Sequence, residues 1–174
     1  MGVSPPAVFI VVMGVAGCGK SSLGAALAGA EGLPLIEGDD HHSPASREKM
    51  RQGIALTDAD RDGWLATLGQ LLQARPQGAV LTCSALKRVY RDRLRSACPG
   101  LRFVFLEIDR ASAGLRVAAR AGTHFFSSSL VGSQFATLEP PVGEPGVLRL
   151  DALAPLSTLQ QQASAWLAAS QESA

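Results

Sequence analysis

Short apolar runs alternate with longer stretches of helical character along most of the chain. The runs are rich in aliphatic and β-branched residues and have the length of buried strands, at residues 7–13, 33–37, 78–83, 101–108 and 146–150. The stretches around them predict helices over residues 21–30, 44–52, 58–74, 85–97, 111–121 and 156–170. This alternation predicts an α/β fold in which a parallel sheet carries helices on both faces.

Two of the predicted helices carry more specific signals. Thr57 or Asp58 is placed to cap the 58–74 helix at its N-terminus. In the 85–97 segment, apolar residues recur at the spacing of one helix face, at positions Leu86, Val89, Tyr90 and Leu94. We therefore expect these four side chains to be the buried side of that helix.

Residues 122–146 break the alternation because they are rich in Gly, Ser and Pro and contain "HFFSSSLVGSQFATLEPPVGEP". A long irregular stretch inside a compact domain is usually a functional lid or a disordered linker, and the aromatic and leucine residues here favour a lid. The chain has 174 residues, of which 47% are hydrophobic, enough for one compact core. We expect one domain over residues 1–174, with a substrate-binding helical region at about 40–75 and a lid at about 116–145.

Charge and cysteine usage narrow the choice of partner and compartment. The formal net charge is +1, which gives no electrostatic reason to expect nucleic acid or an anionic membrane as a partner. The apolar run at 7–13 is too short to span a bilayer and lacks the basic start of a secretory signal. Cys18, Cys83 and Cys98 form no C-x-x-C pair and no metal-binding spacing. A cytoplasmic protein is the resulting expectation.

A glycine-rich turn follows the first apolar run. Within "MGVAGCGKSS", Gly14, Gly19, Lys20 and Ser21 fit the pattern G-x-x-x-x-G-K-[ST], with a strand before and a helix after. Such a loop wraps phosphate groups with backbone N–H groups, its lysine reaches the β- and γ-phosphates, and its serine hydroxyl binds Mg²⁺. ATP and Mg²⁺ are therefore the expected ligands, with Ser21 as the metal ligand. The residues expected to bind ATP are Gly14, Ala16, Gly17, Cys18, Gly19, Lys20, Ser21 and Ser22.

Other motifs and acidic residues in the chain indicate which class of phosphate-loop protein this is. No guanine-reading N-K-x-D occurs, and the D-x-x-G match at residues 60–63 lies in a polar stretch rather than at a strand end. The strand at 78–83 ends without the acid that ATP-driven motors use. Acids instead follow the second strand, at Glu37, Asp39 and Asp40. This arrangement favours a small kinase.

Several polar residues are placed to form an acceptor site. In an open parallel sheet the ligand lies beyond the carboxyl ends of the strands, so Asp39 and residues 84–87 should face the phosphate loop. A carboxylate there can accept a hydroxyl proton, whereas for Asp40 an ordinary loop or cap role is preferred. Of the 16 cationic residues only Lys20, Lys49 and Lys87 are lysines. Lys49, Lys87 and Arg91 could bind an anionic acceptor, although for Lys49 and Arg91 the spacing fits a solvated helix face equally well.

Five segments together carry a family resemblance: "MGVAGCGKSS", "EGDDHH", "EKMRQGIALTDADRDGWL", "CSALKRVYRDRLR" and "HFFSSSLVGSQFATLEPP". The chain resembles the small P-loop gluconokinases from about residue 8 to residue 151. The resemblance implies a P-loop kinase fold with a five-stranded sheet of order 2-3-1-4-5, and transfer of the γ-phosphate of ATP to the 6-hydroxyl of D-gluconate. It also makes a homodimer plausible.

The resemblance assigns roles to individual residues. Lys20 would be catalytic, Asp39 would act at the acceptor hydroxyl, and Arg116 and Arg120 would be lid arginines that reach the transferring phosphate. The residues that it implies for substrate binding are Asp39, His42, Lys49, Lys87, Arg91, His124 and Gln134. Glu37 stands where the family pattern has Asp. "RAGTHFF" carries one residue more between arginine and histidine than the family pattern, which affects the register of Arg120.

Two other functions are compatible with parts of the pattern. A related kinase would act on shikimate or a nucleoside monophosphate, but a flat base needs an aromatic or apolar sandwich, and this region offers little beyond Trp64. A nucleotide-binding regulatory module without turnover is the second alternative. The presence of Lys20, Ser21 and Asp39 together with a full lid argues against it.

Overall fold

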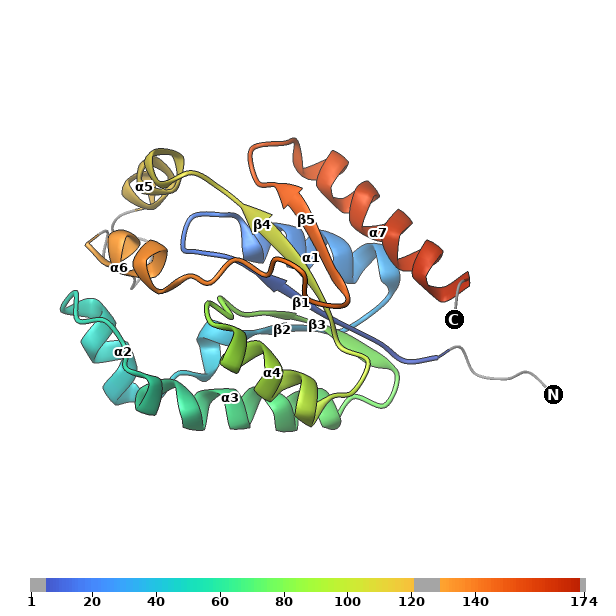
Figure 1. The fold of residues 1–174 in the computed structure, drawn as a ribbon, viewed down its shortest axis with the longest axis horizontal. Coiled ribbons are helices and arrows are strands. Elements are labelled where there is room, and N and C mark those ends of the chain that lie inside the picture. The colour runs from blue at the N-terminus through green and yellow to red at the C-terminus, as the bar shows by residue number, and fades with distance from the viewer. Residues whose placement is uncertain (1–5, 121–128, 173–174) are drawn as a thin grey trace.

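The computed structural model describes residues 6–120 and 129–172. Five strands form one parallel sheet with the order β2-β3-β1-β4-β5 (Figure 1). Their bounds are β1 Val8–Met13, β2 Leu35–Glu37, β3 Gly78–Thr82, β4 Arg102–Glu107 and β5 Val147–Asp151. The predicted α/β fold and its strand order are confirmed.

The helices lie on both faces and at one end of this sheet. Helices α1 and α7 pack together on one face, and α3 and α4 pack together on the other (Figure 1). Helices α5 and α6 contact each other at the end of the sheet where β1 and β4 finish. The helix bounds are α1 Lys20–Glu31, α2 Pro44–Arg51, α3 Asp58–Gln73, α4 Arg88–Ala97, α5 Arg110–Ala119, α6 Leu130–Thr137 and α7 Leu156–Glu172, with a 3₁₀ turn η1 at Gly38–His41.

The burial of the central strands explains their uninterrupted apolar sequence. Residues 10–13 of β1 and every residue of β3 are buried, because helices cover the sheet on both faces. Thr57 caps α3 and forms a capping box with Asp60, which confirms one of the two expected caps. In the part of the chain that the structure describes, no helix combines the length and hydropathy needed to cross a membrane.

Two expectations about helices were wrong. The 122–146 stretch is not wholly irregular, because residues 130–137 form α6. Leu86, Tyr90 and Leu94 are buried, but Val89 is 64% exposed, and Arg91, two positions further along α4, is fully buried. Arg91 can occupy that position because all of its guanidinium nitrogens donate hydrogen bonds, to the Glu144 carboxylate and to the carbonyl oxygens of Ala85 and Glu139.

Candidate active site

The turn between β1 and α1 has a backbone that requires glycine. Gly14, Gly17 and Gly19 have φ values of 146°, 87° and 96°. A Cβ on Gly14 would lie 2.9 Å from the carbonyl oxygen of Leu106, and one on Gly17 would lie 2.7 Å from that of Ala113. Since the N-cap residue Gly19 has no side chain, the first N–H groups of the 12-residue helix α1 are left without a side-chain cap. A helix start of this kind binds phosphate.

Two cations hold the carbonyl side of this loop. The Lys20 Nζ donates to the carbonyl oxygens of Gly14, at 2.9 Å, and Val15, at 3.2 Å. From α5, Arg116 Nη1 approaches the carbonyl oxygens of Gly17 and Cys18 at 3.3 and 3.4 Å. Both cations therefore contact carbonyl oxygens of the loop and not its N–H groups.

Oxygen atoms gather where β2 and β3 end beside α1. The Ser21 hydroxyl donates to Glu37 Oε2 at 3.0 Å, and the Thr82 hydroxyl donates to the same oxygen at 2.6 Å. Oxygen ligands suit Mg²⁺, which usually binds one or two protein oxygens together with substrate phosphates. Across residues 6–120 and 129–172 no group of three His, Cys, Asp or Glu side chains could hold a metal by itself. The donor set thus fits a metal held mainly by nucleotide phosphates.

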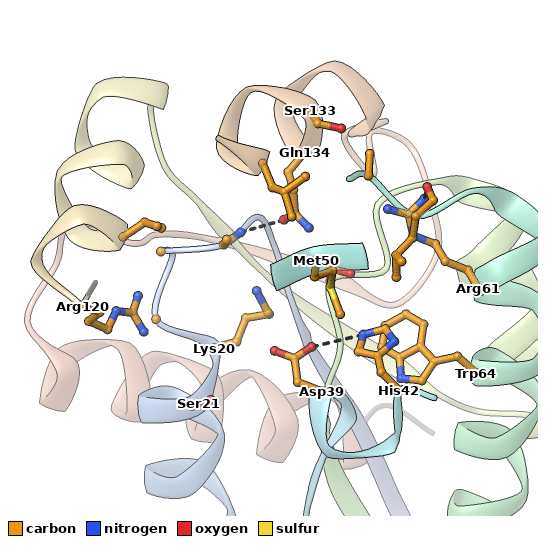
Figure 2. A pocket seen from close by; sticks show the side chains of 18 residues that line it. Lys20, Ser21, Asp39, His42, Met50, Arg61, Trp64, Arg120, Ser133 and Gln134 are labelled. Carbon is orange, nitrogen blue, oxygen red and sulfur yellow. Dashed lines mark hydrogen bonds and ion pairs between the residues drawn. The ribbon is translucent and has the colours of Figure 1, made fainter. Parts of the chain in front are cut away.

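The η1 turn that carries Asp39 is hydrogen-bonded to β3, α2 and α3. The Gly38 N–H donates to Thr82 Oγ1 at 3.3 Å, and Trp64 Nε1 donates to the Gly38 carbonyl at 2.8 Å. Arg47 of α2 donates to the Asp40 carbonyl at 2.7 Å and also reaches the carbonyls at positions 39 and 42. A Cβ at Gly38 would lie 2.2 Å from the Thr82 carbonyl oxygen, so only glycine fits there. The turn is rigid, and it places the Asp39 carboxylate opposite Lys20 (Figure 2).

His42 forms the wall beside Asp39. Its ring stacks on Trp64 with a centroid distance of 4.1 Å and an interplanar angle of 21°. Its Nε2 lies 3.6 Å from Asp39 Oδ1. Within the described ranges, Nδ1 of this buried histidine has no hydrogen-bond partner. The histidine therefore contacts both the candidate base and the apolar floor of the site.

These elements enclose one pocket. Its lining comes from the phosphate loop, the η1 turn, α2 and α3, Ser84 after β3, the end of α5, and α6. From α6, Gln134 Oε1 accepts a hydrogen bond of 2.8 Å from the Ala16 N–H, so α6 is attached directly to the loop (Figure 2). Arg120 borders the same pocket beside the loop. A phosphate donor at the loop and an acceptor at Asp39 would share this space.

Comparison with known proteins agrees with this geometry. Residues 9–141 match a family described as an AAA domain. The gluconokinase of Gluconobacter oxydans is 44% identical over 153 residues, which cover 86% of this chain and 84% of that protein. The thermoresistant gluconokinase of Escherichia coli is 39% identical, with 84% and 85% covered. The chain belongs to the gluconokinase family.

Comparison with solved structures supports the same family and identifies the fold. A crystal structure of a gluconokinase from Sinorhizobium meliloti has 48% identity and a TM-score of 0.87, and the match covers 97% of this chain and 95% of that one. An APS kinase from Mycobacterium tuberculosis, at 20% identity and a TM-score of 0.65, shares the fold. The fold is therefore that of the P-loop kinases.

The structure brings together some of the residues that were predicted for the site and separates others. The predicted residues that line the pocket are Ala16, Gly17, Gly19, Lys20, Ser21, Asp39, His42, Arg120 and Gln134. Gly14 and the buried Cys18 shape the loop from behind, Arg116 contacts loop carbonyls, and Ser22 is exposed on α1. His124 lies outside the described residues. Which of these residues act in the gluconokinase reaction stays a prediction.

Three predicted acceptor residues have other partners. Lys49 Nζ lies 2.8 Å from Asp60 and, with the Thr57 contacts, holds the pKa of that carboxyl at about 2. Lys87 Nζ lies 3.0 Å from Asp58, and hydrogen bonds from Tyr90 and Lys87 lower the pKa of Asp58. Neither lysine lines the pocket.

Arg91 does not reach the pocket. Its side chain has 0% exposure, and it binds Glu144 in two hydrogen bonds of 2.9 and 2.6 Å. A buried guanidinium that is already paired with a carboxylate is unavailable to a gluconate carboxylate. The expectation that it contacts the substrate is not supported by its position in the gluconokinase-family fold.

Sequence reasoning also missed a charged residue that does line the pocket. Arg61 is buried on α3 in the same stripe as Trp64, Leu65, Leu68 and Leu72. The signal that could have found it was its helical phase, because positions 61, 64, 65, 68 and 72 share one face. The charged residues around it, in "DADRDG", make that helical phase difficult to recognise in the sequence.

Proposed function

We propose that this protein transfers the γ-phosphoryl group of ATP to the 6-hydroxyl of D-gluconate, giving ADP and 6-phospho-D-gluconate. The observation that carries this proposal is the shared pocket of Lys20, after β1, and Asp39, after β2, in a chain 44% identical to a gluconokinase. The name of these relatives is the reason for proposing D-gluconate as the acceptor. The pocket contains the side chains that the transfer needs.

The phosphate loop would bind the nucleotide. Its N–H groups and the start of α1 would face the ATP phosphates, while Lys20 would turn from the Gly14 and Val15 carbonyls towards the γ-phosphate. Ser21 is the candidate protein ligand for Mg²⁺, and its hydroxyl donates a hydrogen bond to Glu37. When bound, the metal supplies neutralising charge at the β- and γ-phosphates.

Asp39 would act on the acceptor. The 6-hydroxyl oxygen forms the new bond to phosphorus, its proton passes to the Asp39 carboxylate, and the bond between the γ-phosphorus and the ADP oxygen breaks. The hydrogen bonds around η1 and the adjacent His42 would keep the carboxylate in place for an in-line attack. Arg120 would stabilise the charge on the transferring phosphoryl group, and Arg116 would position the loop.

The segment at about 116–145 is the proposed lid. Closing it over both substrates would exclude water and reduce hydrolysis of ATP. Its described part, α6, already contacts the loop through Gln134 and Ala16, so closure would start from an attached helix. We place the reaction in the cytoplasm, and the three cysteines, which are buried and unpaired, suit a reducing compartment.

The test is ADP release from Mg-ATP with D-gluconate, shikimate, AMP, CMP or no acceptor. We expect release that depends on gluconate, with phosphorus attached at C6 by ³¹P NMR of the product. Lys20→Ala should abolish it while circular dichroism stays that of the folded chain. Release that depends on another acceptor would reject gluconate as the substrate, and release equal to the no-acceptor control would reject the kinase assignment.

A further inference from the structure

One cation in the pocket wall has no role in the proposal above. Arg61 of α3 lines the pocket and is only 8% exposed, among apolar side chains of the same helix face. Burying a guanidinium is unfavourable unless its charge and its N–H groups are compensated. The contacts of Arg61 therefore indicate what is expected to bind beside it.

The guanidinium is held along one edge only. Its Nη1 donates to the Leu56 carbonyl at 2.9 Å and to the Tyr90 hydroxyl at 3.2 Å. Among the residues placed by the structure, Nε and Nη2 have no hydrogen-bond partner and no carboxylate lies within 4 Å of the group. The nearby acid, Asp58, is engaged by Lys87 and by the Tyr90 hydroxyl. The edge of the guanidinium formed by Nε and Nη2 thus remains available to bind a ligand.

The position of Arg61 indicates which end of the acceptor would meet its Nε and Nη2 groups. Figure 2 shows Arg61 on the α3 side of the pocket, across from Lys20, with Asp39, His42 and Trp64 between them and below. An acceptor whose reacting hydroxyl is at Asp39 would extend its other end towards α3. In D-gluconate the 6-hydroxyl and the C1 carboxylate are at opposite ends of a six-carbon chain.

We propose that Arg61 binds the C1 carboxylate of the acceptor through Nε and Nη2, and that this contact makes the site select a sugar acid over a neutral polyol. The inference rests on the proposed function for the identity of the acceptor. Paired N–H groups of arginine match the two oxygens of a carboxylate, and a lysine cannot reproduce that geometry. Leu56 and Tyr90 fix the orientation of the fork by holding Nη1.

The decisive comparison uses two acceptors that differ only at C1. D-Gluconate carries a carboxylate there, and D-glucitol carries a neutral hydroxymethyl group. We expect Arg61→Met to lower kcat/KM for gluconate by about 10²–10³-fold, the scale of two charge-assisted hydrogen bonds, mostly through KM. For glucitol kcat/KM should change by less than about threefold, and the KM for ATP should stay the same. Arg61→Lys should retain charge but not the fork and fall between the two.

Controls separate binding from folding. Arg88→Met removes an exposed arginine of α4 that pairs with Asp92, and we expect it to leave both acceptors unchanged. If Arg61→Met is insoluble, Tyr90→Phe carries the test, because it removes one support of Nη1 and should raise the gluconate KM several-fold without affecting glucitol. Equal losses for both acceptors, or an unchanged gluconate KM, would overturn the assignment of Arg61.

Failure of this inference is distinguishable from failure of the proposed function. If wild-type protein uses gluconate and Arg61→Met keeps its KM, the function stands and Arg61 is not the carboxylate site. If wild-type protein uses shikimate instead and Arg61→Met loses it, gluconate is rejected and the carboxylate site stands. Turnover only with an acceptor that lacks a carboxylate would reject both.

Discussion

Replacing Arg91 by Met should reveal how strongly one buried cation holds two parts of the fold together. Its guanidinium binds Glu144 in two hydrogen bonds, the Ala85 carbonyl at 2.7 Å and the Glu139 carbonyl at 2.8 Å. The first contact is to the segment after α6, and the second is to the turn after β3. The substitution fills similar volume but leaves the two carbonyls without this donor and removes one of the two arginines that bind Glu144.

The expected loss of stability can be worked from those contacts. Removing one partner of a buried ion pair costs about 3–5 kcal/mol. The lower end applies here because Arg95 Nη1 still lies 2.9 Å from Glu144. The two carbonyls add about 1 kcal/mol each. We therefore expect a loss of about 5 kcal/mol, a large part of the roughly 5–15 kcal/mol that a domain has.

Urea unfolding followed by circular dichroism measures this loss. Glu144→Gln should cost less, and the Arg91→Met/Glu144→Gln double variant should lose clearly less than the sum, because it leaves no unpaired buried carboxylate. Arg88→Met on the same helix is the matched control and should stay within about 0.5 kcal/mol of wild type. A loss below about 1 kcal/mol for Arg91→Met would refute the reasoning.

Three further outcomes follow from the geometry of the site and its surroundings. Asp39→Asn should keep ATP affinity and lower kcat by about 10²–10⁴-fold in the ADP-release assay; normal turnover would remove Asp39 as the base. Gly38→Ala should lower both the urea midpoint and kcat, because its Cβ would lie 2.2 Å from the Thr82 carbonyl oxygen, and wild-type values would show that η1 can shift. Lys49 and Thr57 depress the pKa of Asp60 from 3.8 to about 2. The stabilising contribution of the Asp60 carboxylate is therefore present above about pH 4 and lost as the pH falls to 2. Between pH 5 and pH 2 the urea midpoint of Asp60→Asn should therefore change less with pH than that of wild type.

The parts of the fold that repeat a simple pattern were predictable from the sequence. Strand β1 is apolar throughout, and β3 is apolar up to its last residue, Thr82, because both of their faces are covered. The glycine pattern of the phosphate loop indicates a backbone that favours glycine. On α4 the periodicity correctly marks Tyr90 and Leu94 as buried but misses Arg91, because it counts an arginine as a surface residue. In the structure it is buried, with its charge compensated by an acid 53 residues away.

The candidate site was less predictable because its contacts join distant segments. From the sequence, Lys49 and Lys87 could bind an anionic acceptor. In the structure they pair with Asp60 and Asp58, which lie 11 and 29 residues away along the chain. Conversely, Arg61 looked like one of several surface charges and proved to line the pocket. Spacing along the chain identifies the loop that binds phosphate, whereas the choice of acceptor depends on pairings that spacing does not encode.

The strand order also has a consequence for synthesis of the protein. Strand β1 pairs with β3 and β4 but not with β2, so its first partner is made about 70 residues later. At roughly 5–20 residues per second, the apolar segment VFIVVM waits about 3–14 seconds on the ribosome before β3 exists. During that interval the backbone N–H and C=O groups of this segment have no neighbouring strand to pair with.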